Sequence, residues 1–333
     1  MMDCLMSTRG EANLTYSTDF HLQGFDHLQN YRICLFIFFF FTYLFTLSGN
    51  ILIILIVCHQ VNLHTPMYFF IINLSLLEIW YVSTTVPNLL ALMLTNNSRI
   101  SFHWCFAQLY MFHGLGMTEC ALLAIMAFDR YVAICNPLRY TTIINRTMCK
   151  RLASICWFYG FLSSIIPLTA TLKLPLCGQR NINHFFCDLA PLLSLSCIDT
   201  HSNDIINSCV IGFATMSNLV IIIVMYINII YSVIKIRNNA GRNKAFSTCS
   251  SHIIVVSLFY STAFTVYASP KHVRSVDFDK VVALVYGMFT PLLNPLIYSL
   301  RNKDVKTAFN KLFQNILENI IYRKDKIIKT CSL

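Results

Sequence analysis

Seven long apolar runs constrain this 333-residue chain more than any other feature. A helix needs about 20 mostly apolar residues to cross a lipid bilayer. The runs are Ile33–Val57, Met67–Leu94, Trp104–Phe128, Leu152–Leu172, Ile205–Ile234, Ala245–Ser269 and Val281–Leu300. Only Glu78 and Glu119 bring charge into them. In lipid, only helices and closed barrels satisfy their own backbone, and barrel strands are much shorter than these runs. We therefore predict an all-α membrane protein, a bundle of seven transmembrane helices.

The charged residues agree with this topology and argue against a nucleic-acid partner. They make up 12% of the chain, whereas soluble domains carry roughly 25%. The net charge of +10 comes from basic clusters between the apolar runs, at Arg130 to Arg151, at Lys235 to Lys244 and from Arg301 onward. No aromatic residues are interleaved with them on polar faces, so they indicate the positive-inside pattern of a membrane protein rather than nucleic-acid binding.

Because the number of runs is odd, the two termini are expected on opposite sides of the membrane. The basic clusters place the C-terminus inside and the N-terminus outside. This predicts an extracellular segment over 1–30, a domain of seven transmembrane helices over 31–300 and a cytoplasmic tail over 301–333. The tail begins with apolar residues at helical spacing from Asn302 to Asn319, which predicts a short amphipathic eighth helix at the membrane surface, followed by basic residues that attract anionic lipids. A glycosylation sequon at Asn13 lies in the outer segment.

Five of the 14 cysteines fall on the predicted outer side, where disulfides persist. With Cys4 set aside as the odd one, the other four allow three pairings, and the residues alone do not choose among them. These four are Cys105, Cys177, Cys187 and Cys197.

Several short motifs resemble those of one receptor family. The stretch Met126–Tyr140, with Asp129, Arg130 and Tyr131 at its centre, resembles the third-helix motif of the odorant receptors, a branch of the rhodopsin-like G-protein-coupled receptors. Further motifs of that family occur at Gly49-Asn50, Leu63–Phe70, Lys244–His252 and Pro291–Asn302. The resemblance extends from about Gly49 to Phe309. The chain departs from the family pattern modestly, with Phe128 before the Asp-Arg-Tyr triplet, Met225 before the span-five tyrosine and a longer tail.

The resemblance implies pairings and roles that composition does not supply. It favours disulfides between Cys105 and Cys187 and between Cys177 and Cys197. It also implies that Arg130, beside Asp129 in an ion pair that can break, finds partners in the active state when the sixth span moves outward and opens a cleft for a G-protein helix. The residues that it assigns to coupling and activation are Asp129, Arg130, Tyr131, Tyr226, Asn294, Pro295 and Tyr298.

Two carboxylates at membrane depth are costly and indicate function. Glu119 precedes Arg130 by three helical turns, roughly 16 Å, and faces the same side of its helix. Glu78 is expected to reach it, with Asn50 and Asn294 nearby. The family resemblance gives Glu78, Glu119 and Asn50 a sodium ion as an allosteric modulator, with no other cofactor required. A shared proton or a hydrogen-bonded pair is the competing interpretation.

The outer halves of the third, sixth and seventh spans predict an enclosed, mostly apolar pocket with a few polar groups. No acidic residue lies on the outer half of the third span, which disfavours an amine ligand. The predicted ligand contacts are Gln108, Leu109, Phe112, His113, Gly116, Tyr260, Ala263, Phe264, Tyr267 and Gly287.

The resemblance implies an odorant receptor of the plasma membrane that binds a small volatile organic molecule and activates a stimulatory, olfactory-type heterotrimeric G protein to raise cyclic AMP. A receptor of the same fold for a non-odorant molecule outside the olfactory epithelium remains an alternative. A retinal protein needs a lysine in the last span, and the predicted last span, Val281–Leu300, contains none. No catalytic motif indicates an enzyme, and no internal repeat indicates a transporter.

Overall fold

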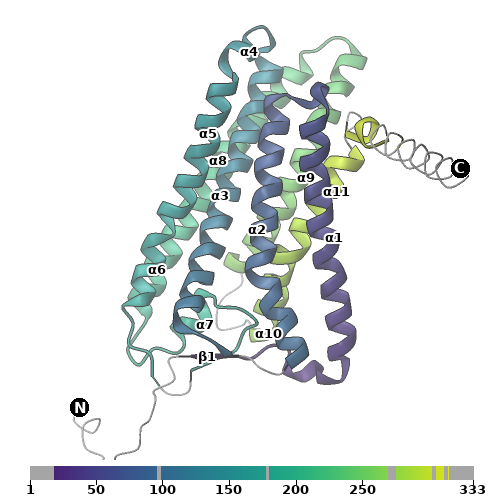
Figure 1. Cartoon of the computed structure of the whole chain (residues 1–333). Coiled ribbons are helices and arrows are strands. Elements are labelled where there is room, and N and C mark those ends of the chain that lie inside the picture. Colours follow the sequence, from purple (N-terminus) through teal and green to yellow (C-terminus); the bar gives the residue numbers. More distant parts are fainter. Residues whose placement is uncertain are drawn as a thin grey trace, which may run out of the picture.

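The computed structural model describes residues 19–95, 99–177, 180–268, 275–301, 305–310 and 314. Within these residues, long helices run side by side in a bundle, and short strands and loops cover one end (Figure 1). Six helical segments are long and apolar enough to cross a membrane. The remaining long helix, α9, spans 30 residues, and Cys249–Thr265 is an apolar stretch within it. The predicted sequon, the basic tail and Cys4 lie outside the described residues.

The observed helices cover the predicted spans, except that two spans are interrupted. The helices of the bundle are α1 (Arg32–His59), α2 (Pro66–Thr95), α3 (Phe102–Cys135), α5 (Arg146–Ser163), α6 (Ile165–Leu172), α8 (His201–Ile234), α9 (Asn239–Ala268), α10 (Val276–Leu284) and α11 (Thr290–Arg301). Short helical segments occur at η1 (Asp26–Tyr31), η2 (Val61–Leu63), η3 (Pro137–Arg139), α4 (Tyr140–Ile143) and α7 (Leu189–Leu193). Residues 305–310 are also helical, with Val305 and Ala308 buried, and the rest of the predicted eighth helix is outside the described part.

The two interruptions lie at Ser164 in the fourth span and at Val285–Phe289 in the seventh. The fourth span is broken between α5 and α6 at Ser164, close to Pro167, where the hydroxyls of Ser163 and Ser164 both donate to the Gly160 carbonyl. The seventh span contains a π-helical stretch, η4 (Val285–Phe289), between α10 and α11. Proline lacks the amide hydrogen that continues a helix, so segments that contain it need other groups to satisfy the freed carbonyls.

The bundle buries polar groups inward and exposes apolar side chains outward, as expected in lipid rather than water. The helix α3 lies at the centre, and α1, α5 and α8 are much less buried. Exposed aromatic side chains such as Phe41, Phe45 and Phe158 cover their outer faces. A soluble protein does not leave apolar surface of this extent uncovered.

Gly160 allows α3 and α5 to pack closely. A Cβ atom on Gly160 would lie 2.6 Å from the Gly114 carbonyl oxygen and would overlap the Thr118 hydroxyl, so α3 and α5 could not pack this closely with a larger residue. Small residues at such crossings are typical of membrane helix pairs.

One end of the bundle is covered by a small three-stranded sheet of order β2-β1-β3. The strand β1 (Phe20–Leu22) pairs antiparallel with β2 (Arg99–Ile100) and parallel with β3 (Asn181–Ile182), so three distant segments meet there. Figure 1 shows β1, α7 and α10 at this end and α4 at the other. We call the end with β1 the disulfide end, since both disulfides lie there. We call the opposite end the Arg130 end.

Asn50 links the first and seventh spans at the point where the seventh lacks a backbone hydrogen bond. Pro295 cannot donate to the carbonyl of Pro291, four residues earlier. Asn50 Nδ2 donates to that carbonyl oxygen at 3.2 Å and to the Thr46 oxygen at 3.0 Å. Gly49 lies beside Pro295, and a Cβ atom at its position would lie 3.4 Å from the proline ring, an ordinary van der Waals distance. The hydrogen bond to the Pro291 carbonyl explains physically why Asn50 and Pro295 occur in the same chain.

The Asn50 bond gives a testable prediction. Asn50→Ala leaves the Pro291 carbonyl unsatisfied in a water-free core and is expected to lower stability by about 1–3 kcal/mol. In a Pro295→Ala background, the restored backbone amide satisfies that carbonyl, so the same change should cost less than about 1 kcal/mol. Thermal unfolding of the four purified variants measures this coupling, and strictly additive effects would contradict it.

Candidate functional site

A cavity of about 240 Å³ lies between α3, α8 and α9, beneath the loop that carries Cys187. It is lined by Tyr81, Phe112, His113, Gly116, Met117, Cys120, Asp188, Leu189, Ala190, Leu193, Asp204, Asn207, Ser208, Ile211, Thr215, Phe259, Thr262, Ala263 and Tyr286. Drug-sized ligands occupy pockets of roughly 300–1,000 Å³. This cavity is smaller, and it therefore suits a small molecule.

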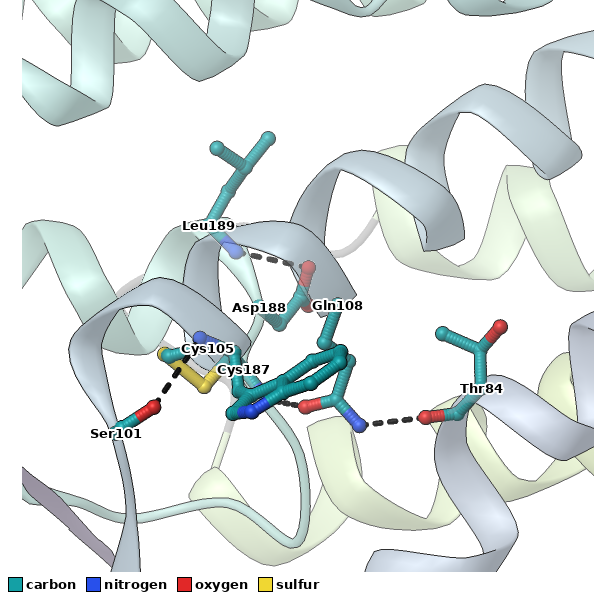
Figure 2. The surroundings of a disulfide bond; sticks show 8 residues. Thr84, Ser101, Cys105, Gln108, Cys187, Asp188 and Leu189 are labelled. Carbon is teal, nitrogen blue, oxygen red and sulfur yellow. Dashed lines mark hydrogen bonds between the residues drawn. A yellow bond between two sulfur atoms is a disulfide. The ribbon is translucent and has the colours of Figure 1, made fainter.

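The loop above the cavity is held by a disulfide and a glutamine. The structure contains the Cys105–Cys187 disulfide and the Cys177–Cys197 disulfide, the pairings that the family resemblance favoured. Figure 2 shows Gln108 between the loop and α2: its Nε2 donates to the Thr84 carbonyl at 2.6 Å, and its Oε1 accepts from the Cys187 amide at 3.0 Å. A buried amide that uses both ends in this way fixes where the next loop residue, Asp188, enters the bundle.

Asp188 points its carboxylate toward α3. Its Oδ1 caps α7 by accepting from the Leu189 amide at 2.8 Å (Figure 2), and it lies 3.3 Å from Nε2 of His113, without the alignment of a hydrogen bond. Burial raises the pKa of the Asp188 carboxyl, but His113, His184 and the Leu189 amide outweigh burial and hold that pKa below its ordinary value. The carboxylate therefore stays charged at the mouth of the cavity.

Asn207 on α8 is a polar group of the cavity whose side chain is unpaired among the described residues. It is 5% exposed, and neither its amide nitrogen nor its amide oxygen makes a hydrogen bond within the described residues. Leaving such a group unpaired costs about 1–3 kcal/mol. A ligand that offers both a donor and an acceptor would recover that cost.

The structure assigns the predicted contact residues to different roles. Phe112, His113, Gly116 and Ala263 line the cavity. Leu109 and Tyr260 are buried in neighbouring apolar clusters, and Gly287 packs near the ring of Phe112. Phe264 is 65% exposed and faces outward, so its assignment to the ligand site is wrong. The side chain of Tyr267 lies outside the described part of the chain.

Sequence reasoning missed the contribution of α8 and of the loop. Asp204, Asn207, Ile211 and Thr215 recur every three or four residues, so they share one face of α8. Three of them are polar and recur at helical spacing, a signal that could have identified this face. The loop carboxylate Asp188 had no such signal. The absence of an acidic residue from the outer half of the third span disfavoured an amine ligand. Because Asp188 and Asp204 both line the cavity, that argument no longer holds.

A second polar cluster lies deeper in the bundle. Glu78, Glu119, Asn50 and Asn294 are all at most 3% exposed. Asn294 Nδ2 donates to Glu78 Oε1, and three buried acceptor oxygens have no hydrogen bond among the described residues: Glu78 Oε2, Glu119 Oε1 and Asn294 Oδ1. An all-oxygen donor set of this kind fits a hard cation such as sodium. Asn50 directs its amide nitrogen to Thr46 and Pro291 instead.

At the Arg130 end, the predicted ion pair between Asp129 and Arg130 is absent from the described contacts. Asp129 Oδ1 instead accepts a hydrogen bond from the Tyr140 hydroxyl at 2.8 Å. Adjacent helical residues point about 100° apart, so Asp129 faces α4 while Arg130 faces the bundle. The expectation of a direct ion pair was therefore wrong for this conformation.

The tyrosines expected to meet Arg130 are engaged elsewhere or unpaired. Tyr226 forms a 2.7 Å hydrogen bond with His252 Nδ1 of α9, and the buried Tyr298 hydroxyl makes none with the described residues. Cys249 of α9 is buried against Ile229 and Val233 of α8, with Tyr131 beside them. The helices α8 and α9 are thus packed together at this end.

Comparisons with known proteins agree with the geometry. The crystal structure of squid rhodopsin superposes with a TM-score of 0.67 at 20% identity, covering 87% of each chain, which shows the seven-helix rhodopsin fold. A model of the olfactory receptor family matches residues 39–316. Human olfactory receptor 6N1 is 42% identical over 305 residues, which make up 92% of this chain and 98% of that protein. Human olfactory receptor 11H4 is 47% identical over 303 residues, 89% of this chain and 92% of that protein.

The chain thus has the seven-helix fold of rhodopsin. The chain belongs to the olfactory receptor family. It is therefore an odorant-type G-protein-coupled receptor of the plasma membrane with several membrane-crossing helices, and not an enzyme.

His184 in the loop gives a prediction about pH. Burial and the nearby Lys280 charge lower its pKa from 6.5 to about 4, although Asp188 opposes them. Between about pH 6.5 and pH 4, His184 is therefore protonated in the unfolded chain but neutral in the folded chain. The free energy of unfolding is unaffected by this group above about pH 6.5 and decreases as the pH falls toward 4. The loss is about 3 kcal/mol.

His184→Phe should remove this part of the pH dependence, because the phenyl ring keeps the stacking on Phe185 and the edge-to-face contact with Phe186 and cannot titrate. Thermal unfolding of both proteins between pH 7 and about pH 4.5 tests this expectation. Parallel losses of stability in the two proteins would contradict it.

Proposed function

We propose that this receptor binds a small volatile organic molecule in the cavity between α3, α8 and α9, and activates a stimulatory, olfactory-type heterotrimeric G protein to raise cyclic AMP. The disulfide end is extracellular and the Arg130 end cytoplasmic. The observation that carries the ligand proposal is a small cavity beneath a disulfide-held loop, in which the buried Asn207 amide lacks a partner among the described residues.

The lining of the cavity narrows the ligand chemistry. Apolar and aromatic side chains make up most of the wall, and among the described residues neither lysine nor arginine lines it. The carboxylates of Asp188 and Asp204 would repel an anionic ligand. A molecule with an apolar body and one hydroxyl, carbonyl or amine group therefore fits better than a carboxylic acid.

Coupling is proposed at the Arg130 end. Outward movement of α9 away from α8 would break the packing around Cys249 and the bond between Tyr226 and His252. Tyr226 would then be available to Arg130, and the space left between the helices would admit a helix of the G protein. The ligand wall includes Phe259, Thr262 and Ala263, so the same helix α9 touches the cavity and the G-protein side.

The central test uses cells that express the receptor and report cyclic AMP while a panel of volatile molecules is applied. For an activating ligand with a hydroxyl or carbonyl group, Asn207→Leu should raise the half-maximal concentration by about 5–30-fold, since one or two hydrogen bonds are lost. Phe264→Ala is the matched control, because Phe264 faces outward and should leave the response unchanged. Equal effects of the two variants at equal surface expression would contradict the proposal.

We also propose that sodium binds near Glu78, Glu119 and Asn294 and favours the resting state. Replacing external sodium with choline is expected to raise basal cyclic AMP in the wild type, because the cation no longer holds the buried carboxylates together. Glu119→Gln removes one of these charges and should abolish the sodium effect. A sodium response of the same size in both proteins would favour the shared-proton interpretation.

A further inference from the structure

A second cavity, of about 670 Å³, opens at the Arg130 end, far from the ligand site. It lies between the ends of α1 and α2 on one side and α4 and the beginning of α5 on the other. We call it the inner groove. One wall is apolar and includes Leu63, Phe69 and Ile72, and the rim is polar and carries Arg146 and Lys150.

The charged side chains of the inner groove, among the described residues, are all of one sign. Arg146 and Lys150 are exposed, lie four residues apart and therefore share one face of α5. No Asp or Glu lines the groove, and neither cation has a carboxylate partner within the described part of the chain. Two like charges on one face repel each other unless an anion lies between them.

The backbone adds to this charge. The helix α5 begins at Arg146, and Asn145 caps it by accepting from the Met148 amide at 2.9 Å. The first turn of an 18-residue helix carries a partial positive charge and unpaired amide groups. This helix start lies beside the two cationic side chains, and Asn145 itself lines the groove.

We propose that the inner groove binds an anionic phospholipid from the membrane leaflet at this end. The phosphate groups of the lipid lie between Arg146, Lys150 and the start of α5, and one of its acyl chains lies against Phe69 and Ile72. A lipid fits better than a soluble phosphate compound because the apolar wall continues from the cationic rim at the membrane-surface ends of the helices. The bound lipid would join α2 to α5 at the level of Asp129 and Tyr140, since Tyr140 also lines the groove.

The alternative is that Arg146 and Lys150 only interact with the membrane surface as a whole, as many basic residues do. The two interpretations differ in what they require. General surface attraction depends on the amount of charge, whereas a binding site depends on where the charge lies and on the apolar wall beside it.

The test uses the full-length receptor in nanodiscs of phosphatidylcholine with a small fraction of phosphatidylinositol bisphosphate, and native mass spectrometry to count lipids retained by the protein. The wild type should retain the anionic lipid, and a variant with Arg146→Gln and Lys150→Gln should bind it at least about tenfold more weakly. The matched control carries Arg139→Gln and Arg151→Gln, which remove the same charge from exposed residues at the same end but outside the groove. It should bind as the wild type does.

Two further measurements make the result decisive. Ile72→Trp fills the apolar wall without changing charge and should also weaken retention. The soluble headgroup, inositol trisphosphate, should compete poorly with the lipid. Equal losses in the two glutamine variants, unchanged binding by Ile72→Trp, or soluble headgroup binding as tight as lipid binding would each overturn the proposal. Thermal unfolding establishes that each variant is folded.

Discussion

The structure depends on how a few buried polar groups are satisfied where water cannot reach them. In a bilayer, each unpaired backbone or amide group costs several kcal/mol, so those that are present must bond within the protein. Asn50 supplies the hydrogen bond that Pro295 cannot, and Asn294 bonds Glu78. Gln108 does the same for the loop above the ligand cavity. These side-chain amides form hydrogen bonds between segments that otherwise contact one another mainly through apolar side chains.

The buried groups that lack such bonds are equally informative. Asn207, the oxygens around Glu119 and the Tyr298 hydroxyl are buried but make no hydrogen bond among the described residues. They lie at three successive depths: the ligand cavity, the centre of the bundle and the Arg130 end. Groups of this kind are positioned to gain partners when a ligand, a cation or a different helix arrangement supplies them.

Much of the fold could be predicted from the sequence because lipid imposes a simple rule on length and charge. The spans and their order follow from that rule, whereas the break at Ser164 and the π-helical stretch depend on local packing and were not predicted. Asp188 could not be placed either, because its position depends on a disulfide and on Gln108, both of which act across long sequence separations. Phe264 was misassigned because helical spacing alone does not distinguish the inner face of α9 from the adjacent lipid-facing one. The Asp129 bond to Tyr140 depends on the short helix α4, which carries no strong sequence signal.

The claim that the ligand is bound beside Asn207 connects the cavity, the loop and α9 in one account. The most direct measurement is an experimental structure of the receptor with an activating small molecule bound, at a resolution that places the ligand. The account predicts that the polar atom of the ligand lies within about 3.2 Å of the Asn207 amide, with the apolar body against Phe112 and Phe259. A ligand bound elsewhere, with this cavity left without it, would contradict the account.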